Sequence, residues 1–325
     1  MALRLVPAKD VPKARKAGAT PIAVVRADLR ADPRADPRVT HLAKQLNKEV
    51  LMLCESEDAG SQLVDLPEKC AFELIPEIRP EMRSVYHIVG PSGAGKSTVA
   101  AGFARNFHEL GPGNIMLITS VAGKPDPAFE KIEHTVLPVS QALEELSMEE
   151  IEQSSQGHPS LLIFDDVEGV KDAERRALQG FQQRALETGR KLGIHVLNIF
   201  HRPASGKATR ASLGESNGVV FFPKANKGNL PYMLKSHFGI DPKIIPHLKD
   251  GWGHWILLRT DGMPAYILGE KRAAIFDTDQ IAKALRERDA AERAIERVKA
   301  KAAITLDKDA LLRRLRGVDL EDDEE

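Results

Sequence analysis

Residues 85–98 are Val85-Tyr86-His87-Ile88-Val89-Gly90-Pro91-Ser92-Gly93-Ala94-Gly95-Lys96-Ser97-Thr98, a short apolar run followed by a glycine-rich turn. The turn fits the pattern G-x-x-x-x-G-K-[ST] in full, with a strand predicted before it and a helix after it. Its glycines allow positive φ angles, so the backbone can curl around an anion with its N–H groups pointing inward. The stretch therefore predicts a phosphate-binding loop, or P-loop, between a buried strand and a helix.

Every residue of that loop is a candidate nucleotide contact. The helix that starts near Lys96 adds the positive end of its dipole to the loop. We expect Lys96 to reach the β and γ phosphates of a nucleotide, Ser97 to coordinate Mg²⁺, and Thr98 to support the start of the helix. The loop by itself does not choose between a kinase, a GTPase, a transporter ATPase and a motor. The predicted binding residues are Gly90, Pro91, Ser92, Gly93, Ala94, Gly95, Lys96, Ser97 and Thr98.

A second acidic motif lies at the end of another apolar run. Residues 159–164 predict a buried strand that ends in Asp165-Asp166. The carboxyl ends of parallel strands meet at one edge of a sheet, so both carboxylates should emerge beside the phosphates. Asp165 is placed to hold Mg²⁺ together with Ser97. Asp166 points differently and is the candidate general base that polarises the attacking water.

From Ser84 onward, short apolar runs alternate with amphipathic segments, which is typical of a parallel sheet covered by helices. We predict an α/β fold of the P-loop NTPase class, RecA-like (ASCE), with a mostly parallel central sheet flanked by helices and with N- and C-terminal appendages. The predicted strands are residues 85–89, 115–119, 161–164, 196–200, 219–222, 255–259 and 265–268.

The two ends of the chain differ from this core. Five prolines and a tandem Ala-Asp-Pro-Arg repeat at 31–38 predict a flexible or loosely packed arm over the first 40 residues. Residues 40–80 should be ordered but peripheral, with a helix at 41–48, an apolar run at 50–53 and a strand at 70–75.

Beyond the core, charge-dense helices at 279–301 and 308–316 and the acidic tail 321–325 predict a solvated or partner-binding appendage. The predicted domains are therefore 1–80, 81–275 and 276–325.

Composition limits the partners. The 325 residues carry 46 basic and 47 acidic side chains, a net charge of -1, so a nucleic-acid partner would have to be bound locally. The sequence shows neither a secretion signal nor the roughly 18 consecutive apolar residues of a membrane span. We therefore expect a soluble, non-secreted protein without a membrane span. Cys54 and Cys70 match neither a zinc nor a redox spacing, and we expect free thiols.

Residues 188–203 are Thr-Gly-Arg-Lys-Leu-Gly-Ile-His-Val-Leu-Asn-Ile-Phe-His-Arg-Pro. Here the chain resembles the FtsK/HerA superfamily of DNA-pumping ATPases, in which a Gly-Ile-His strand leads to a polar sensor followed by Arg-Pro. It resembles more closely the genome-packaging ATPases of nucleocytoplasmic large DNA viruses. That branch has a paired Asp-Asp motif, a Thr-Gly-Arg before the sensor strand, and a stretch similar to residues 208–216 before a strand ending Phe221-Phe222-Pro223. The resemblance covers roughly residues 84–270.

The resemblance implies roles for further residues. His201 stands where FtsK-like motors carry Gln, and it can hydrogen-bond a phosphate oxygen or the attacking water. Arg190 matches the arginine that such motors project across the subunit boundary onto a neighbour's ATP, as an arginine finger. Arg210 is the second candidate for that role and Arg202 the third. Asp166 replaces the glutamate common in motor ATPases, so its assignment as the base depends on the viral pattern.

The resemblance also implies a function. The chain would be an ATP-driven translocase of double-stranded DNA that forms a homo-oligomeric ring and packages a viral genome. Its partners would include a capsid or portal-vertex protein, in the host cytoplasm or the virion. DNA contacts should be made to phosphates and be insensitive to sequence. The basic loops that could supply them are Gly123-Lys124 and residues 224–229, with Lys224 and Lys227 as the candidate contacts.

Two other functions stay open at this point. A small-molecule kinase is one, because a similar P-loop opens many nucleoside and nucleotide kinases. The adjacent aspartates and the run from Arg190 to Pro203 argue against it, since a kinase needs neither. A scaffold that binds ATP, assembles and hydrolyses little is the other. An ABC-type transporter ATPase is disfavoured because no Leu-Ser-Gly-Gly-Gln signature precedes Asp165.

Overall fold

The computed structural model divides the chain into two compact units, Met1–Asp277 and Thr278–Glu325. In the second unit it describes only the helical positions 290, 293, 294 and 297. The predicted helix at 41–48, most of the one at 279–301, the one at 308–316 and the acidic tail lie outside the described residues. The described residues of the first unit are 2–27, 51–56, 62–67, 70–77, 82–120, 126–155, 157–201, 214–225, 230–238, 240, 248–259 and 265–276.

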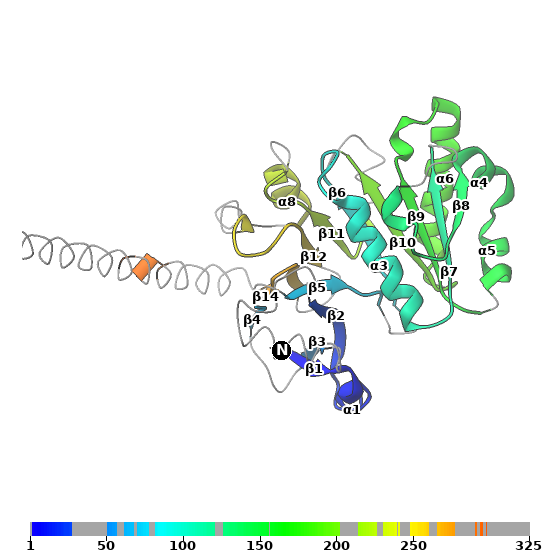
Figure 1. Cartoon of the computed structure of the whole chain (residues 1–325). Helices are drawn as coiled ribbons and strands as arrows, with labels where there is room; N and C mark the ends of the chain where they lie inside the picture. The colour runs from blue at the N-terminus through cyan, green and yellow to red at the C-terminus, as the bar shows by residue number, and fades with distance from the viewer. Residues whose placement is uncertain are drawn as a thin grey trace, which may run out of the picture. The chain divides into compact units, whose positions relative to one another are not determined.

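Among these residues, a ten-stranded sheet runs in the order β4-β14-β13-β12-β11-β6-β10-β9-β7-β8 (Figure 1). The strands from β11 to β8 pair in parallel, and β12, β13, β14 and β4 extend the sheet by antiparallel pairing. All seven predicted strands are present, and β4, β8 and β14 are additional. Their bounds are β4 Leu63–Asp65, β6 Val85–Val89, β7 Asn114–Thr119, β8 Thr135–Pro138, β9 Ser160–Asp165, β10 Ile194–Phe200, β11 Gly218–Phe221, β12 Ile256–Arg259, β13 Ala265–Gly269 and β14 Arg272–Phe276.

Helices cover both faces of this sheet. Successive strand residues point to opposite faces, and the apolar residues of β6, β9 and β10 accordingly divide between two cores. One core includes Phe103 and Phe107 of α3, and the other includes Leu178 and Phe181 of α6. The predicted α/β P-loop fold is therefore confirmed. The helix bounds are α3 Lys96–Leu110, α4 Val139–Glu145, α5 Met148–Ser155, α6 Asp172–Thr188 and α8 Leu230–Phe238.

A second sheet forms from the N-terminal region. It is antiparallel, in the order β1-β3-β2-β5, and contains the buried, unbridged thiols of Cys54 and Cys70. The helix α1, Val11–Lys16, packs against its outer face through Ala14. The strand bounds are β1 Ala2–Pro7, β2 Thr20–Ala27, β3 Leu51–Ser56 and β5 Cys70–Leu74.

The predicted loose arm is therefore wrong for residues 2–27. The prolines of this segment occupy positions where the missing N–H is tolerated. Pro7 ends β1, and Pro12 lies in the first turn of α1. Pro21 precedes a register shift in the pairing of β2 with β3. The repeat at 31–38 lies outside the described residues.

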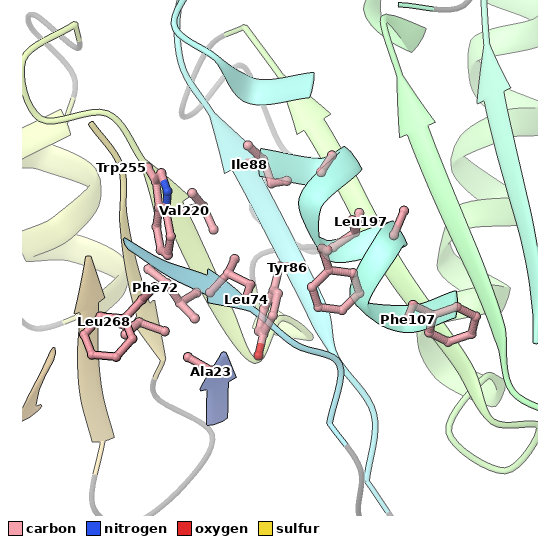
Figure 2. Close-up of a cluster of buried hydrophobic side chains, with 14 of the residues drawn as sticks. Ala23, Phe72, Leu74, Tyr86, Ile88, Phe107, Leu197, Val220, Trp255 and Leu268 are labelled. Atoms are coloured by element: carbon pink, nitrogen blue, oxygen red, sulfur yellow. The ribbon is translucent and has the colours of Figure 1, made fainter. Parts of the chain in front are cut away.

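The N-terminal sheet packs directly on the larger sheet. Ala23, Phe72 and Leu74 share one core with Tyr86 and Leu268 (Figure 2). Polar contacts join the same parts: the Arg26 guanidinium donates hydrogen bonds to Glu73 (2.9 Å) on β5 and to Asn106 (2.7 Å) and Glu109 (2.6 Å) on α3. The described part of residues 2–77 thus belongs to the same unit as the P-loop.

Candidate active site

The P-loop leaves the carboxyl end of β6 and ends at the first turn of α3. Gly93 and Gly95 have φ angles of 74° and 96°, in the left-handed region that favours glycine. A Cβ atom on Gly90 would lie 2.7 Å from the Phe222 ring, so only glycine fits where the loop crosses that ring. Phe222 follows β11 and thus supports the loop from the neighbouring strand.

Lys96 is the buried cation of the site. Its ammonium donates a hydrogen bond to the Pro91 carbonyl at 3.1 Å, and its Nζ lies 3.3 Å from Nδ1 of His201. Burial lowers the pKa of Lys96, and surrounding carboxylates oppose that shift. In order of effect, those carboxylates belong to Asp166, Asp165, Glu168 and Asp126. Within the described part of the chain, the Lys96 ammonium thus lies among four acidic side chains.

Asp165, the last residue of β9, is only 7% exposed. Burial, followed by the nearby charges of Asp166 and Asp126, raises the pKa of Asp165 to about 6. A crowded, buried carboxylate of this kind is stabilised as an anion by a divalent cation. Mg²⁺ bound with ATP needs only one or two protein ligands, because phosphates and water supply the rest. The donor set of Asp165 and the Ser97 hydroxyl, in the first turn of α3, fits that requirement. The described residues contain no group of three or more His, Cys, Asp or Glu side chains able to hold a metal ion without such help.

Asp166 has a φ of 52° and is the non-glycine residue with positive φ among those described. Aspartate tolerates this left-handed conformation better than most residues, at a strain of about 1 kcal/mol. The conformation turns the chain sharply away from β9, and the Ser120 hydroxyl donates a hydrogen bond to the Asp166 carbonyl. The Asp166 carboxylate oxygen Oδ1 lies 2.7 Å from Nε2 of His201.

His201 follows β10, which lies between the P-loop strand β6 and the Asp165 strand β9. This strand order brings His201 between Lys96 and Asp166. Its backbone N–H donates a hydrogen bond to Glu168 at 3.1 Å. Glu168 and Asp126 were not among the predicted site residues. For Glu168, the Asp-Asp-Val-Glu run was an available signal, but Asp126 carries no local signature.

Arg190 lies at the other edge of the sheet. It is exposed in the turn between α6 and β10, before the amino end of β10, whereas Lys96 follows the carboxyl end of β6. The two strands pair in parallel, with Val196 opposite Val85 and Phe200 opposite Val89. These four residue steps alone span about 13 Å. Arg190 is therefore not part of the phosphate site of its own chain.

The remaining predicted residues are only partly described. Arg210, Arg202, Lys227 and the Gly123-Lys124 loop lie outside the described residues. Lys224 is exposed and its Nζ lies 3.8 Å from the Asp250 carboxylate. No helix in the described part of the chain is long and apolar enough to cross a membrane.

Comparison with known proteins gives few matches in sequence. No family model matches the chain. The chain is 29% identical over 223 residues to the uncharacterized protein V3 of Sputnik virophage, covering 67% of this chain and 86% of that protein.

Solved structures with a similar arrangement include the genome packaging NTPase B204 of Sulfolobus turreted icosahedral virus 2 with AMPPCP. It has a TM-score of 0.41 at 13% identity, over 59% of this chain and 98% of that one. The pCW3 conjugation coupling protein TcpA with ATPγS also has a TM-score of 0.41, at 12% identity over 84% of this chain and 82% of that one. The strand β6, the phosphate loop and the helix α3, set in a mostly parallel sheet, give the chain the fold of a P-loop NTPase.

Proposed function

We propose that the chain hydrolyses Mg-ATP to translocate double-stranded DNA, acting as a homo-oligomeric ring that packages a viral genome. The observation that carries the proposal is the contact chain Lys96–His201–Asp166 at one edge of the sheet, with Arg190 at the opposite edge. The first three residues form most of a hydrolytic site. The fourth lies away from that site, and we infer that it acts in the site of another subunit.

The chemistry follows from charges already in position. Mg²⁺ bound with ATP would neutralise phosphate charge, held by Ser97 and Asp165. Lys96 exchanges its contact with the Pro91 carbonyl for oxygens of the β and γ phosphates. The Asp166 carboxylate orients a water and accepts its proton as the water oxygen bonds to the γ phosphorus. The bond between that phosphorus and the β–γ bridging oxygen breaks at the same centre, and ADP leaves. His201 holds that carboxylate and lies close enough to Lys96 to respond to the γ phosphate.

Arg190 completes the site of a neighbouring subunit in this proposal. An arginine placed on the transferred phosphoryl group stabilises the charge that develops there, and removing such an arginine lowers kcat by about 10³-fold or more. Supply of the arginine in trans makes hydrolysis depend on assembly. It also makes ATP hydrolysis in one subunit depend on the position of its neighbour. A ring needs this dependence if its subunits are to hydrolyse ATP one after another as DNA moves.

The DNA-handling part of the proposal draws on the sequence motifs and on the similar viral proteins. The virophage relative and the packaging NTPase B204 are viral, and TcpA is a conjugation coupling protein. We infer that Lys224 and Lys227 contact DNA phosphates without regard to base sequence. A capsid or portal-vertex protein would hold the ring at the particle, in the host cytoplasm or the virion.

ATP hydrolysis measured against protein concentration and duplex length tests the proposal. We expect the rate per subunit to rise with both, because assembly supplies Arg190 and long duplex occupies more of the ring. A rate per subunit that is independent of both would overturn it. Phosphate transfer to a nucleoside in the absence of DNA would favour the kinase instead.

The Asp166→Asn variant separates a motor from a scaffold. We expect it to bind ATP normally and to lose about 10²- to 10⁴-fold in kcat, because the amide cannot take the proton. Asp172→Asn is the matched control, since Asp172 is an exposed aspartate at the start of α6 that pairs with Arg175. Equal turnover by Asp166→Asn and the wild type would favour the scaffold.

A further inference from the structure

Arg83 is a buried arginine, 7% exposed, that immediately precedes Ser84 and β6. Its Nη1 donates hydrogen bonds to the carbonyls of Ala185 (2.6 Å) and Ile194 (3.4 Å), and its Nη2 donates to the carbonyl of Leu186. The last carbonyls of a helix lack partners within the helix, and a cation there also complements the helix dipole. Arg83 therefore caps α6 and ties it to the first residue of β10.

The capping guanidinium has no carboxylate in ion-pair contact among the described residues. Burial, and to a lesser extent the charge of Arg190, lower the pKa of Arg83, whereas the exposed Glu215 opposes the shift. A buried charge must recover its lost hydration through hydrogen bonds. The backbone carbonyls of α6 and β10 supply them here, so the guanidinium and the turn between these elements depend on each other.

Gly189 shows how closely the cap meets the turn that carries Arg190. A Cβ atom at Gly189 would overlap both the Arg83 guanidinium and the Ala185 carbonyl. The Gly189 carbonyl accepts hydrogen bonds from the N–H groups of Ile194 (2.8 Å) and Leu192 (3.2 Å), which closes the turn. The residue directly before Arg190 is therefore packed against Arg83.

A second set of contacts fixes the other side of the turn. The Ser84 N–H donates a hydrogen bond to Nδ1 of His195 at 3.0 Å, and the Ser84 carbonyl accepts one from Val196 at 2.9 Å. Burial, followed by the charge of Arg83, lowers the pKa of His195 to about 4. His195 is therefore neutral near pH 7 and its Nδ1 can accept. Arg83 and Ser84, the two residues before β6, thus contact both ends of the turn that joins α6 to β10.

We propose that Arg83 is the positioning residue for Arg190: by joining the end of α6 to the start of β10, it sets the direction in which Arg190 leaves the sheet toward the ATP of a neighbouring subunit. The inference rests on the proposed action of Arg190 in trans. It also gives β6 a double role, because the strand carries the P-loop at one end and the support of the arginine at the other. Displacing a catalytic group by about 1 Å can lower a rate about 100-fold.

Mixing of variant subunits tests the proposal. Lys96→Ala subunits cannot hydrolyse ATP but can still place Arg190 in the ATP site of a neighbour. Arg190→Ala subunits have an intact ATP site but place no arginine in the neighbour's site. A mixture of the two should hydrolyse ATP about tenfold faster than either alone. A mixture of Arg83→Met with Lys96→Ala should regain ATP hydrolysis to the same extent. A mixture of Arg83→Met with Arg190→Ala should not regain it, because neither variant supplies a correctly placed Arg190 to its neighbour. In homogeneous rings Arg83→Met should lower kcat about 10- to 100-fold with KM unchanged.

The outcomes separate the two levels of the proposal. Recovery in the mixture of Arg83→Met with Arg190→Ala would overturn the role of Arg83 and leave Arg190 intact. Failure of Arg190→Ala to recover with Lys96→Ala would overturn the trans arginine itself, and the role of Arg83 with it. A merely structural role for Arg83 would lower activity in every mixture alike.

Two further variants keep the test decisive if Arg83→Met does not fold. Arg83→Lys keeps the charge but cannot reach three carbonyls with one planar group, so it should show the same mixing pattern in a milder form. Arg175→Met is the matched control, because Arg175 donates a hydrogen bond to the Val170 carbonyl (3.0 Å) beside the other end of α6. It should behave like the wild type in every mixture.

Discussion

Nε2 of His201 lies 2.7 Å from Oδ1 of Asp166. The other ring nitrogen of His201 lies 3.3 Å from the ammonium of Lys96. A neutral imidazole donates from one nitrogen and accepts at the other, so the tautomer protonated at Nε2 satisfies both contacts. In this state the ring links the group that would bind the γ phosphate to the group that would activate water.

We expect His201→Ala to lower kcat about 100-fold, because Asp166 loses the partner that orients its carboxylate. His201→Gln should retain more activity than His201→Ala, since an amide can both donate and accept. Steady-state ATP hydrolysis measures both variants, and His158→Ala serves as the control at an exposed histidine. An equal loss of kcat in the Ala and Gln variants would show that the hydrogen bonds of the His201 ring do not contribute to ATP hydrolysis.

The raised pKa of Asp165 makes stability depend on pH. The folded protein keeps the Asp165 proton up to about pH 6, whereas an ordinary aspartate ionises near 3.8. Between those values the folded state binds more protons than the unfolded state, so this group makes stability fall as the pH rises from about 4 to about 6.

Asp165→Asn should remove that contribution and be more stable than the wild type above pH 6, by about 1–3 kcal/mol. Urea unfolding of the nucleotide-free protein at pH 4, 5, 6 and 7.5 measures the difference. Asp172→Asn, at an exposed position, should follow the wild type throughout. The prediction is wrong if the gap between Asp165→Asn and the wild type does not widen over this range.

Gly90→Ala should disrupt the P-loop, because the added methyl group would lie 2.7 Å from the Phe222 ring. We expect ATP affinity to fall about tenfold or more, and Gly90→Ala with Phe222→Leu to recover part of it, since the smaller side chain makes room. Gly102→Ala on α3 is the control: its Cβ meets nothing within 4 Å, and alanine favours a helix. Binding of a fluorescent ATP analogue distinguishes the three proteins.

The ion pair of Arg259 with Glu77 should support the packing of the two sheets. The two side chains are 7% and 1% exposed, and Nη2 of Arg259 lies 2.7 Å from the Glu77 carboxylate. Glu77→Ala leaves the arginine charge buried, so unfolding free energy should fall by about 3–5 kcal/mol. Breaking the exposed pair of Arg175 and Asp172 with Asp172→Asn should cost less than about 1 kcal/mol. Denaturant titrations of both variants make the comparison.

The strands of the central sheet and the P-loop were predictable because their signals are local. A buried parallel strand is a short apolar run, and the loop is a contiguous pattern of glycines ending in Lys96-Ser97. The position of His201 beside Asp166 is different, because it depends on the order of the strands, with β10 between β6 and β9. The loose arm predicted from prolines is wrong where Pro7, Pro12 and Pro21 lie, because a proline at a strand end, in a first helical turn or beside a register shift does not interrupt the structure.

The sequence alone therefore determined the class of fold, the phosphate loop and the acidic pair, since each is written in neighbouring residues. Only the tertiary structure decided that the N-terminal strands form a sheet on the same core, that Asp126 joins the site, and that Arg83 caps α6. Those contacts join residues far apart in the chain, 102 positions for Arg83 with Ala185 and 182 for Arg259 with Glu77. The burial of a side chain and the charges around it depend on which distant segments pack together. The sequence does not show which segments these are, because they come together only when the whole core packs.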